Sequence, residues 1–429
     1  MRGANRRSAP AHAVDSAPGE GAQVLERIQL PLPAIGRVLS DFGGVYAANA
    51  IVAFLFAASG PVAIILAVGA SGGLSESDLS SWIFGSFFVN GIITILFSLL
   101  YRQPLAFFWT IPGTVLVGPA LGHLSFPQVI GAFHATGVLM LLLGLSGWVR
   151  RAMASIPMPI VMAMVAGVFL RFGTGLVHAF RENMAVALPM TAVFLALSIA
   201  PRIARYVPPL IGALLAGALA VWLLGSFRAP PGALFSFADP TLYQPQWSWA
   251  AMVELVVPIA ITVLVVQNGQ GMAILSASGH QAPINAITVG CGAGSIVTAL
   301  FGTVSTCLTG PVNAVISSGG AKNRQYTAAI AVGVLALAFG LMAPLLTRLM
   351  LGAPPAFIAT LAGLAMLRVL QTAFVASFRD RFSFGALITF IVTVGDVTLW
   401  NIGAPFWGLL IGIAASWLLE REDFKHPAA

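Results

Sequence analysis

From Gly43 to Leu419 the sequence offers apolar stretches almost without interruption, and this feature restricts the fold more than any other. A stretch of about 20 apolar residues is long enough to cross a bilayer as a helix. Of the 429 residues, 58% are hydrophobic and only 8% are charged, which is too few to make the surface of a water-soluble protein. The sequence therefore predicts an all-α polytopic membrane protein whose solvent is the bilayer.

Apolar runs between polar or Pro/Gly breaks predict about 14 transmembrane helices. Seven lie before a longer polar loop and seven lie after it. The first seven predicted spans are 42–70, 81–100, 105–122, 127–148, 157–178, 185–200 and 208–225. The second seven are 250–276, 283–301, 303–318, 327–347, 355–376, 384–400 and 404–419.

The net charge of +7 comes from basic residues spread through short loops, which is typical of topology signals and not of a nucleic-acid surface. If the N-terminus is inside, the basic loops at Arg102, Arg150, Arg202, Lys322 and Arg379 all fall on the cytoplasmic side. We therefore expect a multi-pass protein of the cell inner membrane, with both termini cytoplasmic and no nucleic-acid partner.

The expected organisation has five segments. They are a disordered cytoplasmic tail at 1–40, a seven-helix repeat at 41–225, an external linker at 226–248, a second seven-helix repeat at 249–420 and a cytoplasmic tail at 421–429. The first 40 residues lack an apolar segment followed by a cleavage site, so they do not resemble a signal peptide.

Seven helices in each half give the halves opposite orientations, so a 7+7 inverted-topology repeat is expected. Two landmarks recur at one shift. Arg171 and Arg368 are separated by 197 residues (368 − 171), and so are Gly113 and Gly310 (310 − 113). Both arginines end similar Ala-Gly-containing runs, and both glycines lie beside a proline.

Spans three and ten carry the residue pattern of broken helices. Thr110 and Thr309 are N-cap types, and Pro112 and Pro311 suit a first helical turn. Aromatic or β-branched residues such as Thr306 precede each break and favour extended backbone. Two half-helix N-termini facing each other near the bilayer centre would attract an anion. The alternative is that Thr and Pro only kink two ordinary spans.

Span eight carries the most polar patch in any predicted span, Gln267-Asn268-Gly269-Gln270-Gly271. Three amides in an apolar run are costly unless they face a cavity or each other. We expect them to face a cavity, and the alternative is hydrogen bonding between close-packed helices.

Few ionisable residues fall within the spans. Arg171 lies about 21 Å along a helix from the start of span five, so it does not easily reach the cytoplasmic interface. We expect it to neutralise a substrate carboxylate, and the alternatives are that it braces the domains or reaches lipid headgroups. The role of Arg368 stays open. Asp41 and Glu254 lie near span ends and Asp396 lies in span thirteen, and no proton-carrying residue is assigned. No cluster of acids, His or Cys has the spacing of a metal or catalytic site, so we expect no cofactor, metal or catalytic residue.

Three motifs together resemble the benzoate/proton symporter (BenE-type) family over the region from Gly43 to Glu420. They are Trp109-Thr110-Ile111-Pro112-Gly113, Ala166-Gly167-Val168-Phe169-Leu170-Arg171-Phe172, and Gln267-Asn268-Gly269-Gln270-Gly271 followed by Gly279-His280. The chain differs from the family pattern at Gly269-Gln270 and at Thr306–Pro311, both within the predicted site.

The resemblance implies proton-driven uptake of an aromatic carboxylate and a fold like that of uracil permeases. In that fold a core domain (spans one to four and eight to eleven) moves against a gate domain. Relatives of the fold often dimerise through the gate domain, so the resemblance also implies a homodimer.

We therefore predict a secondary transporter that imports benzoate or a similar small aromatic carboxylate with protons. The predicted substrate-binding residues are Thr110, Gly113, Gln267, Asn268, Gln270, Thr306, Thr309, Gly310 and Arg171. One alternative keeps the fold but carries a nucleobase or an inorganic anion. Another is a channel or a membrane-embedded enzyme.

Overall fold

The computed structural model describes residues 24–154, 157–204, 207–228, 236–396 and 398–425. The predictions for residues 1–23 of the N-terminal tail, 229–235 of the linker and 426–429 of the C-terminal tail lie outside the described residues.

The first half of the chain forms helices around one short strand. They are α1 (Ile35–Asp41), α2 (Gly44–Ala58), α3 (Gly60–Ser71), α4 (Glu76–Phe84), which continues through a π-helical turn (Gly85–Val89) into α5 (Asn90–Tyr101), β1 (Phe107–Trp109), α6 (Ile111–Ala120), α7 (Phe126–Ser146), α8 (Val149–Ala154), α9 (Met158–Glu182), α10 (Met184–Ile199), α11 (Pro201–Ala204) and α12 (Pro209–Leu223).

The second half repeats this pattern. It contains α13 (Trp249–Ala251), a π-helical turn (Met252–Val256), α14 (Val257–Ile261), a second π-helical segment (Thr262–Asn268), α15 (Gly269–Ala277), α16 (Ile284–Ala299), β2 (Thr306–Leu308), α17 (Gly310–Ile316), a 3₁₀ turn (Lys322–Arg324), α18 (Tyr326–Leu341), α19 (Ala343–Leu351), α20 (Pro355–Phe378), α21 (Ser383–Gly395), α22 (Ala404–Leu419) and a last 3₁₀ turn (Arg421–Phe424).

At least one helix overlaps each of the fourteen ranges that the sequence analysis marked as spans. In the described part of the chain, seven helical stretches are long and apolar enough to cross a bilayer. They are Gly44–Ser71, Glu76–Tyr101, Phe126–Ser146, Met158–Glu182, Trp249–Ala277, Lys322–Leu341 and Pro355–Phe378. Six shorter apolar helices accompany them: α6, α10, α12, α16, α21 and α22.

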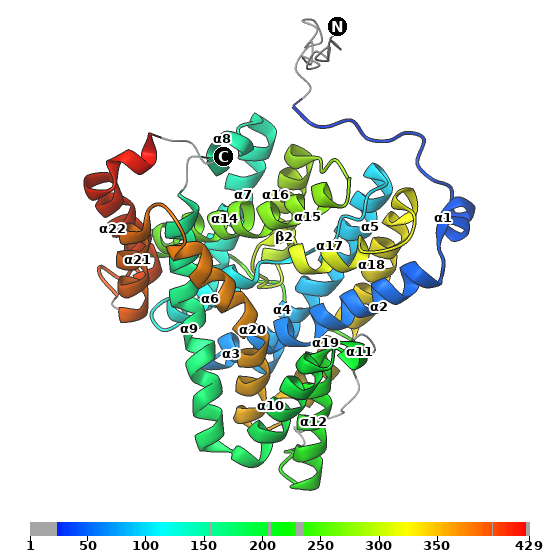
Figure 1. Cartoon of the computed structure of the whole chain (residues 1–429), viewed down its shortest axis with the longest axis horizontal. Helices are drawn as coiled ribbons and strands as arrows, with labels where there is room; N and C mark the ends of the chain where they lie inside the picture. Colours follow the sequence, from blue (N-terminus) through cyan, green and yellow to red (C-terminus); the bar gives the residue numbers. More distant parts are fainter. Residues whose placement is uncertain (1–23, 155–156, 205–206, 229–235, 397, 426–429) are drawn as a thin grey trace, which may run out of the picture.

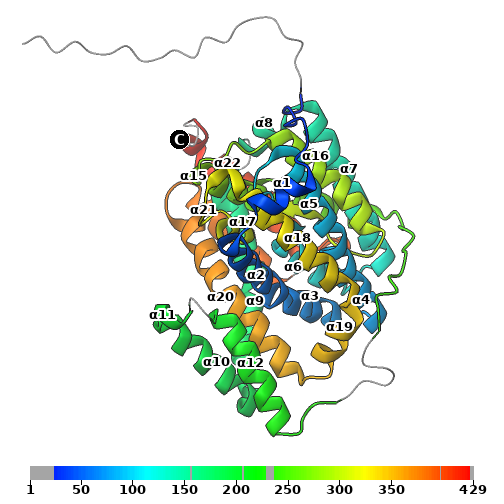
Figure 2. The same cartoon turned by 90° about the vertical axis from the view of Figure 1, so that its right-hand side faces the viewer.

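The helices pack in two groups (Figures 1 and 2). The first helix group contains α2 to α7 and α13 to α18, with α16 against α7 and α18 against both α2 and α5. The second helix group contains α9, α10, α12, α20, α21 and α22, with α20 against α9 and α22 against α21. Contacts between α3 and α20 join the groups, and Gly60 makes this approach possible because an added Cβ would lie 2.4 Å from Ala365 Cβ.

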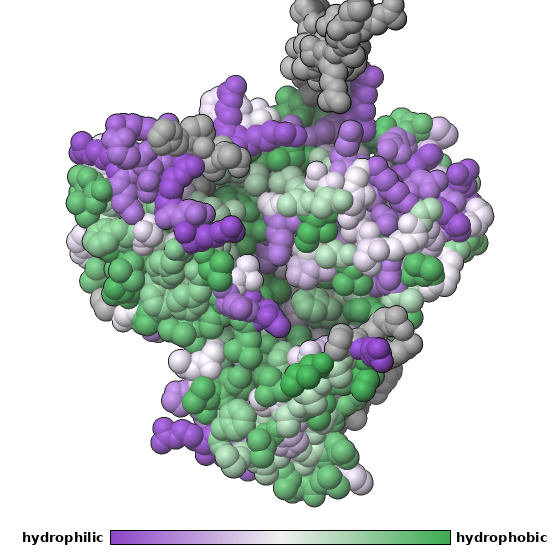
Figure 3. Space-filling model, in the orientation of Figure 1, coloured by the Kyte–Doolittle hydropathy of each residue, from purple (hydrophilic) through white to green (hydrophobic). Residues whose placement is uncertain are grey.

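Hydrophobic residues cover most of the face shown in Figure 3, while hydrophilic residues gather at its upper rim. The first and last described residues lie at this same end of the molecule in Figures 1 and 2. Large apolar side chains such as Ile199, Trp222 and Trp249 are 80%, 73% and 81% exposed. Such a surface is stable in lipid and not in water.

The structure differs from the predicted spans in two places. The first predicted span bends at Ser59, which has a φ of −96° and a ψ of −94° and separates α2 from α3. Pro61 in the first turn of α3 favours a new helix start there, although the apolar pattern runs on unchanged. The eleventh predicted span, 327–347, covers two helices, because α18 ends at Leu341 and α19 begins at Ala343.

Part of the predicted disordered tail is ordered in the structure. The Glu26 carboxylate accepts hydrogen bonds from the backbone N–H groups of Asn285 and Ala286, both at 3.0 Å. The Gln29 N–H donates to the Leu100 carbonyl at 3.0 Å, and α1 follows. Polar composition predicts disorder, but here the segment finds partners on the ends of α5 and α16.

Candidate functional site

Two three-residue strands pair at the centre of the first helix group. Strands β1 and β2 are antiparallel, with Phe107 opposite Leu308, Phe108 opposite Cys307 and Trp109 opposite Thr306. Each strand is fully buried and runs directly into a helix, β1 into α6 and β2 into α17. The two helix N-termini therefore start from one crossing point.

The strand pair has local two-fold symmetry. The N–H of Thr110 donates to the Ser305 carbonyl at 3.0 Å, and the N–H of Thr309 donates to the Ala106 carbonyl at 3.1 Å. The equivalent strands begin 199 residues apart (306 − 107), and so do the equivalent threonines (309 − 110). The shift of 197 that pairs Gly113 with Gly310 is therefore wrong at this point, because Thr309 is the true counterpart of Thr110.

The two threonines differ in their side-chain bonds. Thr110 Oγ1 accepts from the Gly113 N–H at 3.1 Å and caps α6. It also lies 3.1 Å from Thr262 Oγ1, whose own hydroxyl donates to the Ile259 carbonyl, so Thr110 is the donor to Thr262. Thr309 makes no side-chain cap bond to the seven-residue helix α17. Its hydroxyl is therefore available to another partner.

Buried side chains from neighbouring helices hold the strands, and the sequence analysis missed them. Thr94 of α5 accepts from the Phe107 N–H at 2.8 Å, and Ser295 of α16 accepts from the Thr306 N–H at 3.0 Å. Asn313 of α17 accepts from the Ala106 N–H at 3.0 Å. In the sequence, each of these residues is a single amide or hydroxyl within an apolar run. Such residues are too common in membrane helices to be recognised as supports of the strands.

The amides of the predicted span eight divide into two kinds. Asn268 is 1% exposed, and its Oδ1 accepts from the Leu308 N–H of β2 at 2.7 Å. Gln267 is 7% exposed and Gln270 is exposed, and neither side chain makes a hydrogen bond to the described residues. Gln270 lies against Gly310, where an added Cβ would be 2.4 Å from Gln270 Oε1. Asn268 therefore supports β2. Gln270 leaves its amide free beside the start of α17, and the buried amide of Gln267 also has no partner among the described residues.

Thr306 and Gly113 are also used within the protein. The Thr306 hydroxyl donates to Asn90 Oδ1 at 2.8 Å, and the Gly113 N–H is bound to Thr110. Of the predicted site residues, the structure thus brings Thr110, Gly113, Gln267, Asn268, Gln270, Thr306, Thr309 and Gly310 to one strand crossing. It leaves the polar side chains of Gln267, Gln270 and Thr309 without partners among the described residues.

The two arginines lie in the second helix group, outside the contacts of the strand crossing. Arg171 of α9 forms an ion pair with Asp396 at the end of α21, and both side chains are about half exposed. Arg368 of α20 donates to Gln371 Oε1 at 3.1 Å. The first contact joins α9 to the end of α21 and the second lies within α20, so neither supports the prediction that Arg171 contacts substrate.

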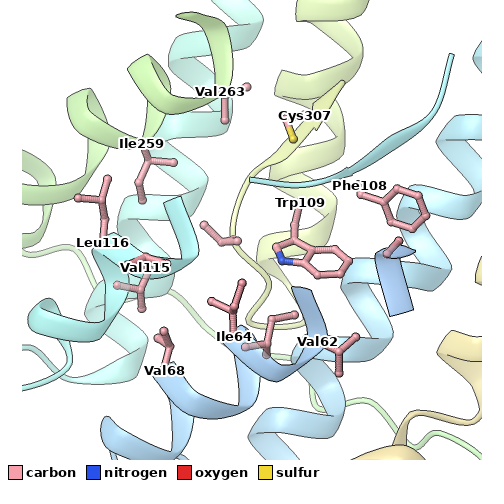
Figure 4. Close-up of a cluster of buried hydrophobic side chains, with 14 of the residues drawn as sticks. Val62, Ile64, Val68, Phe108, Trp109, Val115, Leu116, Ile259, Val263 and Cys307 are labelled. Atoms are coloured by element: carbon pink, nitrogen blue, oxygen red, sulfur yellow. The ribbon is translucent and has the colours of Figure 1, made fainter. Parts of the chain in front are cut away.

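An apolar cluster surrounds the strands. Figure 4 shows the Trp109 ring close to Ile64 and Val62, which follow the break between α2 and α3. Val115 and Leu116 of α6 and Ile259 of α14 lie on the other side of the strands in the same view.

Two polar atoms in this region are buried without a partner among the described residues, Trp109 Nε1 and Ser305 Oγ. A buried unpaired donor is costly, which marks these atoms as candidate ligand contacts. Within the described residues no group of three or more His, Cys, Asp or Glu could hold a metal ion.

Residues 43–418 match the sequence profile of a family described as benzoate membrane transport protein (BenE). The chain belongs to this family. It is 30% identical over 365 residues to a protein of Escherichia coli (strain K12) named inner membrane protein YdcO, which covers 84% of this chain and 92% of that protein. It is 28% identical over 375 residues to the benzoate membrane transport protein of Acinetobacter baylyi (strain ATCC 33305 / BD413 / ADP1), which covers 86% of this chain and 93% of that protein.

Solved structures of anion transporters share the BenE chain's fold. The transmembrane domain of the cyanobacterial bicarbonate transporter BicA has a TM-score of 0.61 and 16% identity, covering 90% of this chain and 100% of that chain. Murine Slc26a9, an anion transporter in the inward-facing state, has a TM-score of 0.54 and 14% identity, covering 96% of this chain and 77% of that chain. The protein is thus a multi-pass membrane transporter and not an enzyme.

Proposed function

We propose that the protein is a secondary active transporter that imports benzoate or a similar small aromatic carboxylate together with protons. The observation that carries the proposal is the pair of polar side chains left free at the start of α17, Gln270 and Thr309. The unpaired amide of Gln267, three residues before Gln270, and an apolar surface around Trp109 accompany them. Membership of the BenE family supports the cargo class.

The carboxylate would bind at the start of α17. The first N–H groups of a helix lack helical partners, and the helix dipole favours negative charge there. The Thr309 hydroxyl and the amides of Gln267 and Gln270 would donate the remaining hydrogen bonds, and Gly310 lets Gln270 approach. Thr110, Gly113, Asn268 and Thr306 would act indirectly, by holding the strands and the start of α6.

The aromatic ring would lie against the apolar residues near the strands. Trp109 lies between the Phe87 ring, whose centroid is 5.1 Å away, and the residues after the break at Ser59. Trp109 Nε1 and Ser305 Oγ, which have no partner among the described residues, would donate hydrogen bonds to cargo bound there. An apolar pocket with a few placed polar groups is the usual form of a small-molecule site.

We also propose the membrane arrangement behind this function. The fourteen helical ranges form a 7+7 inverted repeat with broken helices three and ten, in the inner membrane, with both termini cytoplasmic. The first helix group acts as the core domain and moves as a body against the second, the gate domain. The equivalent backbone hydrogen bonds of Thr110 and Thr309 support the repeat, and a homodimer through the gate domain fits the same arrangement.

Ligand-induced thermal stabilisation of the purified protein tests the cargo class, because a ligand that binds only the folded state raises the Tm. We expect benzoate to raise the Tm and cyclohexanecarboxylate to raise it less, since a flat ring fits the Trp109 surface better. Uracil and bicarbonate should have no effect. Stabilisation by uracil or bicarbonate but not by benzoate would replace the aromatic carboxylate with a nucleobase or an inorganic anion.

A further inference from the structure

A buried pair of ionisable side chains lies away from the candidate substrate site. Glu254 is in the π-helical turn Met252–Val256, and its side chain is 3% exposed. Its Oε2 lies 2.8 Å from Nε2 of His123, which belongs to the connection between α6 and α7. The pair has no part in the site around α17, and neither residue is needed to hold the strands.

The Glu254 carboxylate also touches the second helix group. The backbone N–H of Gly403, directly before α22, donates a hydrogen bond to this carboxylate. A Cβ added at Gly403 would lie 2.4 Å from Glu254 Oε1, so only glycine allows this approach. Helix α22 packs on the same π-helical turn. One carboxylate therefore joins the two helix groups.

Few other ionisable groups surround the contact. His134 of α7 faces the Ile130 carbonyl of its own helix through Nδ1, at 3.0 Å. Asp396, before the connection to α22, is paired with Arg171. The described residues of α6, α13, α14 and α22, which pack on the turn, are not ionisable. His123 is therefore the titratable partner of Glu254.

The strength of this contact depends on the charge of Glu254. A buried carboxylate is stable only when donors satisfy it, and here an imidazole and a backbone N–H do so. Hydrogen bonds to a charged acceptor are about twice as strong as neutral ones. Protonation of Glu254 removes the charge that both donors face and so weakens the contact between the helix groups.

We propose that Glu254 and His123 form the site at which a proton from the outer solution binds when the two helix groups separate on that side. This inference rests on the membrane arrangement given under the proposed function, in which His123 follows span three, Glu254 starts span eight and Gly403 precedes span fourteen, all at outer ends. The carboxylate takes up one proton from water, and only hydrogen bonds change otherwise.

The accessibility of an introduced cysteine to a thiol reagent, beside the contact between Glu254 and Gly403, tests this proton site without any cargo. Ile402 is 8% exposed and adjoins Gly403, whereas Thr398 of the same connection is exposed. In proteoliposomes, Ile402→Cys and Thr398→Cys are labelled from outside with a membrane-impermeant thiol reagent at about pH 5.5 and about pH 8, a range within which a buried carboxylate can titrate. Labelling of the exposed Thr398→Cys is the reference for the ordinary pH dependence of thiol labelling. The measured quantity is the ratio of the Ile402→Cys labelling rate to this reference rate.

We expect this ratio to rise by about fivefold or more at the lower pH, a typical size for coupling between a ligand and a conformation. With Glu254→Gln the ratio should stay the same at both pH values, because the amide takes up no proton. Gly403→Ala, which pushes the carboxylate away, should give a high ratio at both. Glu76→Gln is the matched control, because Glu76 is a carboxylate on the same expected side of the membrane and pairs with Arg348. This variant should keep the wild-type dependence of the labelling ratio on pH.

A ratio that does not change with pH in the otherwise unaltered protein, or one that still changes in Glu254→Gln, overturns the proposal. A pH-dependent ratio that Glu254→Gln abolishes supports it, even if benzoate proves not to be the cargo. The test thus separates a failure of this proton site from a failure of the proposed transport function.

Discussion

Asn268 and Gln267 are neighbours in the sequence, but their amides have different surroundings. Asn268 Oδ1 accepts from the Leu308 N–H at 2.7 Å, and its Nδ2 lies 3.6 Å from Cys291 Sγ. Gln267 has no such partner among the described residues. Of these two adjacent amides, that of Asn268 supports the strands and that of Gln267 is proposed to bind cargo.

Replacing Asn268 with Ala is expected to destabilise the protein. The buried Leu308 N–H would lose its acceptor, which costs about 2 kcal/mol. Thermal unfolding in detergent measures the loss as a lower Tm. Gln270→Ala is the control, because it should leave the Tm unchanged. An unchanged Tm in Asn268→Ala would contradict the supporting role of this side chain.

Gln267→Ala is expected to abolish benzoate uptake with little change in Tm or in membrane insertion. The amide makes no hydrogen bond within the described protein, so its removal affects only a ligand. Uptake into proteoliposomes, compared with the surface-loop variant Gln281→Ala, checks this. Intact saturable uptake would remove Gln267 from the site.

Arg171→Gln is expected to leave the KM for cargo unchanged. Its partner Asp396 is about half exposed, and exposed ion pairs contribute only about 0–1 kcal/mol to stability. The measurement is the concentration dependence of uptake at fixed pH. A KM raised about tenfold or more would return Arg171 to the substrate site, since that change equals about 1.4 kcal/mol of binding.

At the scale of elements, the starts of α6 and α17 could be located from the sequence, because Thr followed by Pro marks a helix N-terminus whatever surrounds it. The pairing of β1 with β2 could not be located in the same way. Three-residue strands carry no readable periodicity, and their register depends on Thr94, Ser295 and Asn313 from distant helices. For the same reason the sequence alone could not separate the supporting Asn268 from the free Gln267.

Helix α21 is capped from another element, and this makes its stability depend on pH. The Glu420 carboxylate accepts from the Phe384 and Gly385 N–H groups at 2.9 and 3.0 Å and from the Ser416 hydroxyl. Burial alone would raise the pKa of Glu420, but these hydrogen bonds hold that pKa below its ordinary value of 4.5. The stabilisation is therefore complete above the ordinary pKa and is lost as the pH falls through the lower folded-state pKa.

Glu420→Gln is accordingly expected to lower the free energy of unfolding by about 1 kcal/mol near neutral pH, as loss of a charged cap does. The difference from the wild type should shrink as the pH falls below 4.5. Chemical unfolding in detergent at several pH values measures it, with the exposed Glu422→Gln as control. An equal difference at all pH values would contradict the assigned cause.

At the scale of the whole molecule, the strand crossing and its free amides belong to the first helix group, while Arg171 and Arg368 belong to the second. A transporter that moves one group against the other carries its cargo with the strands and leaves the arginines behind. Hydropathy could predict the helices of both groups, but not which helices pack together, because that depends on side-chain contacts such as Gly60 with Ala365.

In the proposed function, a proton gradient drives an aromatic carboxylate across the membrane through this protein. The most direct measurement is uptake of radiolabelled benzoate into proteoliposomes containing the purified protein, with and without an inwardly directed proton gradient. We predict saturable uptake that the gradient drives above the external concentration and that other aromatic carboxylates inhibit. Uptake equal to that of empty liposomes, or saturable uptake that does not depend on the proton gradient, would contradict proton-driven import of an aromatic carboxylate.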